Sequence, residues 1–293
     1  MASSRTRERV AQGHPCFGGN RHKNGRIHLA VAPRCNITCG YCDRRHDCAH
    51  ETRPGVTSRL LTPTEALAQV RDVMARSDYG PIIKVIGIAG PGDPLANEET
   101  FETFRLVQRE FPELLFCLSS NGLVLPDRIG ELADINLHSL TVTINAVDPE
   151  VGARIYRQVC YRGRVTTGRE GAGILIRNQF EGMRLAAERG MVVKVNTVLI
   201  PGVNEGQIPL IAEKVSEAGA FLMNVMPIIP QAAFAHVPRP TGEQLEQVRR
   251  ANEGTIAQFR GCQQCRADAI GLIGGCADSK AAVKDDVRRS GQW

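Results

Sequence analysis

The sequence lacks the marks of exported, membrane-spanning and nucleic-acid-binding proteins. No apolar run is long enough to cross a bilayer, and residues 1–12 are polar and charged, without the apolar stretch of a signal peptide. The formal charge of +5 is not gathered into a basic block. We therefore expect a cytoplasmic protein that binds neither membrane nor nucleic acid.

The chain does contain ample apolar residues and many cysteines. Its 293 residues are 42% hydrophobic, which suits one large α/β domain or a barrel with attachments. Ten cysteines in a chain without an export signal favour metal ligation over disulfide bonds. This usage indicates a reducing compartment.

Strand-like and helix-like segments alternate along the middle of the chain. Alternation predicts parallel strands joined by right-handed crossovers, here an α/β fold built as a partial (β/α)6 barrel of TIM type. Active groups gather at the carboxyl ends of the strands in such barrels. Thr62, Pro63 and Glu65 form a helix start with a capping box. The expected strands are 27–32, 82–89, 114–119, 140–145, 192–200 and 221–226, and the expected helices are 63–76, 98–110, 127–133, 173–189 and 207–218.

Three regions are expected around this barrel. Residues 1–26 show no periodicity and are expected to form an irregular arm. Residues 27–230 form the barrel, and residues 231–293 form an extension that contains a polar helix and a charged, mobile tail.

The most informative motif is the CxxxCxxC spacing of Cys35, Cys39 and Cys42. Three thiolates can hold three irons of a [4Fe-4S] cluster and leave the fourth iron open for chemistry. A zinc knuckle or a disulfide fragment is the alternative. With an aromatic residue before the last cysteine, the motif resembles the signature of the radical S-adenosylmethionine (SAM) superfamily. That resemblance implies a catalytic, oxygen-sensitive cluster that chelates SAM and cleaves it to a 5′-deoxyadenosyl radical.

Several polar residues are candidates for binding SAM. Gly90, Gly92 and Asp93 follow an expected strand, where glycines let the backbone approach a ligand closely, although an ordinary turn would look the same. Alternation places polar side chains on one face of three strands, and a cavity that holds SAM would give them partners. The alternative is that these faces line solvent. From those faces we select Asn121, Asn145, Lys194 and Asn196, and by resemblance to the superfamily we add Tyr41 near the adenine.

Taken in order, a series of segments resembles the NifB family of radical SAM maturases of nitrogenase cofactors. The resemblance covers residues 14–275, and it is to the stand-alone form, without a NifX-like domain. Single motifs of this kind are common, but their order and combination are specific. The segments are His14-Pro15-Cys16, Gly25-Arg26-Ile27-His28-Leu29, the cysteine triad, Asp47-Cys48 with Glu51, Arg53-Pro54-Gly55-Val56, residues 87–94, 119–122, 143–149 and 199–204, and Cys262 to Asp268.

The resemblance implies two further [4Fe-4S] clusters, which are precursors that the enzyme consumes. One is held by Cys16, Cys262 and Cys265; without the resemblance, that CxxC pair would more often mean zinc or redox chemistry. The other is held by Cys48 and Cys117, with His28 and Glu51 assisting, although a histidine here is often a satisfied core residue. The family's usual paired histidines are Arg21 and His22 here, and Cys160 and Cys276 match no family ligand; we expect Cys160 to be an apolar filler.

By resemblance, the expected reaction fuses the two precursors into the eight-iron nitrogenase cofactor precursor, NifB-co. One SAM gives a methyl group that becomes a central carbide, a second SAM gives the radical, and an extra sulfide is added. The expected partners are an iron–sulfur donor, a carrier or scaffold protein, and an electron donor such as ferredoxin or flavodoxin. The protein itself is expected to be a monomer. The alternatives are a radical SAM enzyme with auxiliary clusters that modifies a peptide, and a non-catalytic iron–sulfur carrier.

Overall fold

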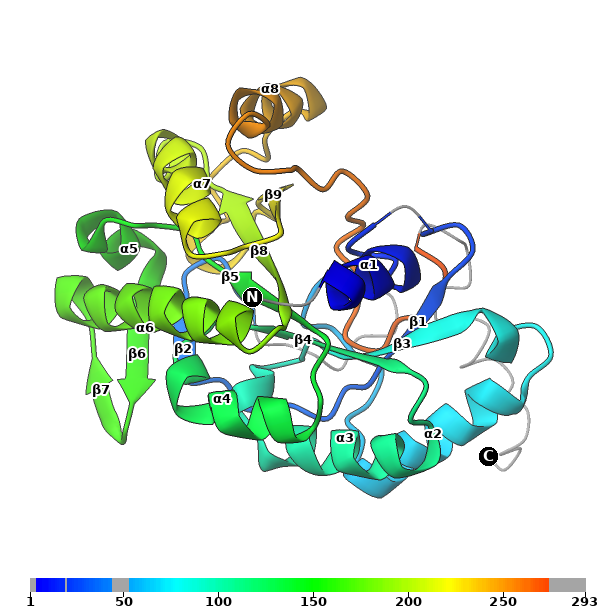
Figure 1. Ribbon diagram of the computed structural model, residues 1–293. Helices are drawn as coiled ribbons and strands as arrows, with labels where there is room; N and C mark the ends of the chain where they lie inside the picture. The colour runs from blue at the N-terminus through cyan, green and yellow to red at the C-terminus, as the bar shows by residue number, and fades with distance from the viewer. Residues whose placement is uncertain (1–3, 19, 44–52, 274–293) are drawn as a thin grey trace, which may run out of the picture.

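The computed structural model describes residues 4–18, 20–43 and 53–273, and a curved sheet of mostly parallel strands lies at its centre (Figure 1). Within these residues the sheet has seven strands in the order β10-β1-β3-β4-β5-β8-β9. Only β10 runs antiparallel, against β1. The bounds are β1 Gly25–His28, β3 Ile83–Ile88, β4 Leu115–Ser120, β5 Ser139–Thr143, β8 Val192–Leu199, β9 Leu222–Pro227 and β10 Ile270–Gly271.

Helices follow the outside of the sheet in an arc (Figure 1). The sheet and its helices confirm the expected partial (β/α)6 barrel, with each of the expected strands and helices present to within a few residues. The capping box at Thr62 and Glu65 starts α2 as expected. None of the helices in the described residues is long and apolar enough to cross a membrane. The helix bounds are α1 Ser4–Gly13, α2 Pro63–Ala75, α3 Glu98–Glu110, α4 Leu125–Asp134, α5 Pro149–Ile155, α6 Gly168–Glu188, α7 Ile208–Glu217 and α8 Gly242–Asn252.

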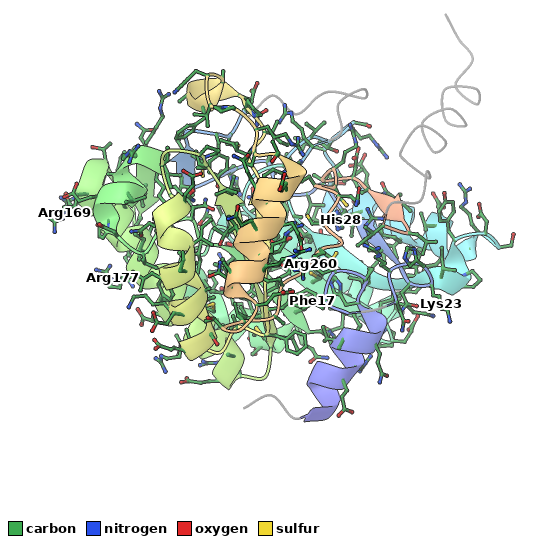
Figure 2. The ribbon with its side chains drawn as sticks, turned by 90° about the horizontal axis from the view of Figure 1, so that it is seen from above. Phe17, Lys23, His28, Arg169, Arg177 and Arg260 are labelled. Carbon is green, nitrogen blue, oxygen red and sulfur yellow. The ribbon has the colours of Figure 1, made fainter. Side chains whose placement is uncertain are left out.

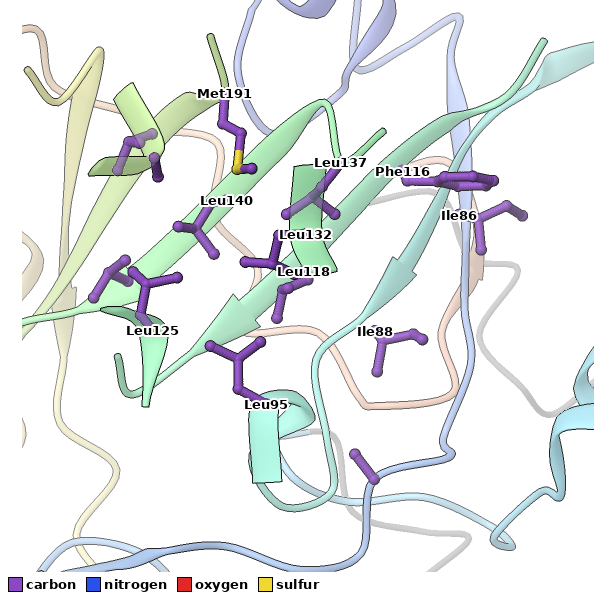
Figure 3. Close-up of a cluster of buried hydrophobic side chains, with 14 of the residues drawn as sticks. Ile86, Ile88, Leu95, Phe116, Leu118, Leu125, Leu132, Leu137, Leu140 and Met191 are labelled. Atoms are coloured by element: carbon purple, nitrogen blue, oxygen red, sulfur yellow. The ribbon is translucent and has the colours of Figure 1, made fainter. Parts of the chain in front are cut away.

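The two faces of the strands carry different chemistry, because side chains alternate along a strand. Ile86 and Ile88 of β3, like Phe116 and Leu118 of β4, point outwards into the apolar layer between sheet and helices (Figure 3). The residues between them point inwards. The inward face of β4 therefore carries Cys117 and Ser119, and both line the interior cavity.

The extension after β9 crosses the open side of the barrel. After α8 the chain returns to β9, where the Phe259 N–H donates to the Met223 carbonyl. It then runs on to β1, with which it pairs as strand β10. In Figure 1 this segment runs from α8 down to β1. Cys262 and Cys265 lie on the crossing stretch, so the extension brings the CxxC pair over the interior of the barrel. The expected polar helix is α8, whereas the expected mobile tail lies outside the described residues.

Two parts of the fold differ from expectation. The arm is not irregular throughout, because residues 4–13 form α1, and Val10 with the following Phe17 packs against Val192 and Leu222 at the amino ends of β8 and β9. This long-range burial stabilises a short polar helix that has no strong local signal. A second, small sheet was also not expected; it consists of β2 Ile37–Cys39, β6 Tyr156–Tyr161 and β7 Arg164–Thr166.

Cys160 is a further correction. We expected an apolar filler, but the residue is exposed on β6. Only Tyr156 and Val159 of β6 are buried, and Arg157, Gln158 and Cys160 are exposed.

Candidate functional site

The cavity is lined by residues that stand in three rows on the inward face of the sheet. The first row, nearest the amino ends of the strands, runs from His28 through Gly87 to Cys117. The second row consists of Ser119, Thr141 and Lys194. The third row consists of Asn121, beyond the end of β4, with Thr143 and Asn196. The cavity therefore extends along three successive levels of the strands.

The cysteine triad lies at the carboxyl end of this cavity. Cys35, Cys39 and Cys42 all line it, and Cys39 is held in the small sheet by the pairing of β2 with β6. Gly92 packs against the start of the triad segment; a Cβ atom there would lie 2.2 Å from the carbonyl oxygen of Arg34. The Gly92 N–H also donates to the Ala32 carbonyl at 2.6 Å. The glycine loop therefore positions the cysteine segment directly.

Asp93 ties the glycine loop to the end of β4. Its buried carboxylate accepts hydrogen bonds from the Ser120 hydroxyl at 3.0 Å, and from the backbone N–H groups of Asn121 at 2.6 Å and Leu95 at 2.9 Å. Burial raises the pKa of Asp93 to about 6, and these three donors act in the opposite direction. Asp93 is thus largely ionised at neutral pH, and it organises the loop that borders the cavity.

The other predicted SAM residues fall into two groups. Tyr41, Asn121, Lys194 and Asn196 line the cavity together with Gly92 and Asp93. Gly90 and Asn145 do not line it. Asn145 is fully buried behind Tyr41, where its side-chain amide donates to the Tyr41 hydroxyl at 2.8 Å and its oxygen accepts from the Val198 N–H. Its direct contact with SAM stays a prediction, and its visible role is to support Tyr41.

His28 and Cys117 lie close to each other in the first row, and both line the cavity. Gly87 separates them in the first row, and a Cβ atom at Gly87 would lie 2.9 Å from the His28 ring. The ring therefore lies over the glycine, toward β4. His28 Nδ1 is 3.1 Å from the Arg266 carbonyl, so Nδ1 carries the proton and Nε2 keeps a free lone pair. Burial lowers the pKa of His28 to about 4, which keeps this ring neutral and able to bind a metal.

The second cysteine group comes from both ends of the chain. Cys16, Cys262 and Cys265 line the same cavity. Arg26 of β1 positions this group: one guanidinium nitrogen lies 3.1 Å from Cys265 Sγ, and another donates to the carbonyl oxygens of Gly271 and Leu272. The predicted ligands Cys48 and Glu51, as well as Cys276, lie outside the described residues. Arg21 and His22 contact each other at 3.1 Å on the surface.

His14 is a cavity residue that has no role assigned from the sequence. Its ring is 3% exposed and lines the cavity. Nδ1 accepts the Cys16 N–H at 3.0 Å, so Nε2 bears the proton, and Nε2 has no partner in the described residues. The quoted His14-Pro15-Cys16 segment was the available signal. A buried donor that points at no protein acceptor fits a cavity that receives an anionic ligand.

The cysteine groups suit metal clusters more than free thiols. Burial raises the pKa of Cys16 to about 12, and it also raises the pKa values of Cys39 and Cys117. Thiolates in such places need a bound cation, which iron supplies. No three His, Cys, Asp or Glu side chains in the described ranges are grouped to hold a single ion. A cubane needs no such group, because each thiolate binds a different iron.

Comparisons with known proteins show a superfamily match and similar sequences. Residues 29–215 match the model of the radical SAM superfamily. The chain is 45% identical to "FeMo cofactor biosynthesis protein NifB" of Methanocaldococcus jannaschii, covering 90% of this chain and 87% of that protein. It is 44% identical to the protein of the same name from Klebsiella pneumoniae, but it spans only 58% of that protein's length.

Solved structures agree on the fold. A radical SAM methyltransferase from Sphaerobacter thermophilus superimposes with a TM-score of 0.57 at 19% identity, covering 84% of this chain and 69% of that one. A structure of TYW1 with a bound lysine–pyruvate adduct superimposes with a TM-score of 0.54 at 12% identity, covering 92% of this chain and 88% of that one. At these identities the likeness shows the fold alone.

Proposed function

Because the chain belongs to the NifB family of the radical SAM superfamily, we propose that it is a radical SAM enzyme of nitrogenase cofactor biosynthesis. Its reaction fuses two [4Fe-4S] clusters with a SAM-derived carbide and an extra sulfide into the eight-iron precursor. The observation that carries this proposal is the meeting of the triad, the group Cys16, Cys262 and Cys265, and Cys117 with His28 in one cavity. A radical SAM enzyme with a single cluster would need the triad alone.

Different residues of the cavity have different roles in the proposed reaction. Cys35, Cys39 and Cys42 hold the resident cluster, which with SAM supplies the 5′-deoxyadenosyl radical. Gly92 and Asp93 shape the adjoining loop for SAM. Tyr41, supported by Asn145, and the amides of Asn121 and Asn196 provide the polar wall of the same end of the cavity.

In our proposal the other ligands that line the cavity hold the cluster substrates. His28 Nε2 and Cys117 belong to one set, and Cys48 and Glu51 complete that set in our proposal. Cys16, Cys262 and Cys265 form the other set. Such small sets, one of them mixing N, O and S ligands, suit a substrate that must be released, because a fully thiolate-bound cluster is held tightly. An iron–sulfur donor, a small electron carrier such as ferredoxin or flavodoxin, and a carrier or scaffold protein that accepts the product complete the proposed setting.

Iron content tests the number of clusters. The wild-type chain, reconstituted without oxygen, is expected to hold about twelve irons as three cubanes. Cys16→Ala should lose one cubane, about four irons, whereas Cys160→Ala should lose none because Cys160 lies exposed on the small sheet. About four irons in the wild type, or full activity in Cys16→Ala, would overturn the proposal.

Product analysis tests the chemistry. Incubation of the loaded chain with reductant and SAM that is labelled in its methyl carbon should yield 5′-deoxyadenosine and S-adenosylhomocysteine together. The label should then appear in the cluster extracted from the protein. Formation of 5′-deoxyadenosine alone, with no label in the cluster, contradicts carbide insertion and favours another radical SAM reaction.

A further inference from the structure

Lys194 stands between the two ends of the cavity. It belongs to the middle row with Ser119 and Thr141, one row nearer the amino ends of the strands than Asn196. The SAM loop and the triad border the far row. The position of Lys194 therefore separates it from the other residues that the sequence assigned to SAM.

The surroundings of the ammonium are aromatic. Lys194 Nζ lies 5.0 Å from the centre of the Phe17 ring and 5.5 Å from that of Phe259, and the residue is 7% exposed. Within the described ranges no carboxylate forms an ion pair with it. Two aromatic faces stabilise a cation but do not neutralise it. The charge of such a buried cation is compensated only when an anion binds beside it in the cavity.

The aromatic residues around the ammonium adjoin ligands of the proposed cluster substrates. Phe17 is the neighbour of Cys16 in the chain, and Phe259 lies on the segment that leads to Cys262. Cys16, Cys117 and Phe259 pack against the small apolar cluster that contains Phe17, and both cysteines line the cavity together with Lys194. The unpartnered Nε2–H of His14 lies on the same side of the cavity. This side therefore presents donors and positive charge beside cysteines of both groups.

We propose that Lys194 is the shared counter-cation of the two auxiliary cluster sites, held by Phe17 and Phe259 so that its charge faces both Cys16 and Cys117. This inference rests on the proposed function. Thiolate-bound cubanes are anionic, and bringing two of them together in a cavity of low dielectric is opposed by their repulsion. A fixed ammonium between the sites lowers that repulsion without binding iron, so it does not hinder release of the product.

Redox titration followed by electron paramagnetic resonance tests this role on the full chain, reconstituted anaerobically. Removing a nearby positive charge makes reduction of an anionic cluster harder. Lys194→Met should therefore shift the reduction equilibrium of the auxiliary clusters at least tenfold toward the oxidised form, a fall in potential of about 59 mV for one electron. The triad cluster, identified by the change in its signal when SAM is added, should keep its potential. Lys194→Arg keeps the charge and should stay near the wild type.

Lys84→Met is the matched control, because Lys84 is exposed on β3 and donates to the Pro81 carbonyl, away from the cavity. It should leave every potential unchanged. Unchanged auxiliary potentials in Lys194→Met, together with weaker binding of SAM, would overturn the inference and return Lys194 to the SAM site. Loss of auxiliary clusters in Lys194→Met but not in Lys194→Arg supports it, and loss in both overturns it.

Different outcomes contradict the proposed function and the role of Lys194. A wild-type chain that holds only about four irons overturns the proposed function itself. A wild-type chain with three clusters, whose auxiliary potentials do not respond to Lys194→Met, overturns only the role of this lysine.

Discussion

The Asp93 carboxylate accepts a 2.6 Å hydrogen bond from the backbone N–H of Asn121, and this bond joins the loop after β3 to the end of β4. Asn121 in turn donates through its side chain to Asn36, beside Cys35 of the triad. A chain of contacts thus connects the glycine loop, the β4 terminus and the cysteine segment. The geometry of the SAM end of the cavity depends on it.

Replacing Asp93 should loosen that end of the cavity. Asp93→Asn puts an amide group where three donors now point at a carboxylate, so at least one buried donor loses its partner, at a cost of about 2 kcal/mol. We expect SAM to bind about tenfold more weakly, as measured by equilibrium binding to the cluster-loaded chain. Asp78→Asn is the control, since Asp78 pairs with Arg76 on the surface. Equal affinities in Asp93→Asn and the wild type would contradict this role.

Asp93 should also leave a signature in the pH dependence of stability. Burial raises its native pKa to about 6, above the value of about 3.9 in an unfolded chain. Between these values the native state binds more protons than the unfolded state, so the contribution of Asp93 to stability is present below about pH 4 and is lost as pH rises toward 6. In urea unfolding of the cluster-free chain, the difference between wild type and Asp93→Asn should shrink across that window. A difference that is constant or grows with pH would show that the native pKa is not raised.

Gly92 and Gly130 offer a matched pair of substitutions. Gly92→Ala places a Cβ atom 2.2 Å from the Arg34 carbonyl oxygen, so the segment that precedes Cys35 must move. We expect the triad cluster to load poorly and SAM binding to be lost, as measured by iron content and binding. Gly130→Ala lies on the exposed side of α4 with nothing within 4 Å of its new Cβ, and it should stabilise the chain by about 1 kcal/mol. Normal loading of the triad in Gly92→Ala would refute the packing argument.

Arg26 should hold the C-terminal crossing segment in place. Arg26→Met removes a buried guanidinium that contacts Cys265 Sγ and the carbonyl oxygens of Gly271 and Leu272. We expect the free energy of unfolding to fall by about 3 kcal/mol. Hydrogen exchange in residues 262–272 should become faster, and iron at the Cys265 site should fall. Arg71→Met, which breaks only an exposed pair with Glu110, should change neither. Unaltered exchange in the segment would mean that other contacts hold it.

The regular part of the fold could be predicted from local patterns. The spacing of apolar residues places the strands and the main helices, because each such pattern reports which face of an element is buried. The capping box at Thr62 marks the start of α2 for a local reason, since both of its partners lie within one turn. In contrast, α1 depends on the burial of Val10 and Phe17 against distant strands, and no local signal carries that information.

The sequence by itself determined which groups the chain can offer: the triad Cys35, Cys39 and Cys42, the glycine loop, and the polar inward faces of the strands. Only the tertiary structure decided how they are used. It places Asn145 behind Tyr41, because the amide finds both of its partners in the protein, and it places Lys194 beside Phe17 and Phe259, toward Cys16. Convergence of residues more than a hundred positions apart follows from the curvature of the sheet and the path of the crossing segment. Spacing in the sequence does not encode that geometry.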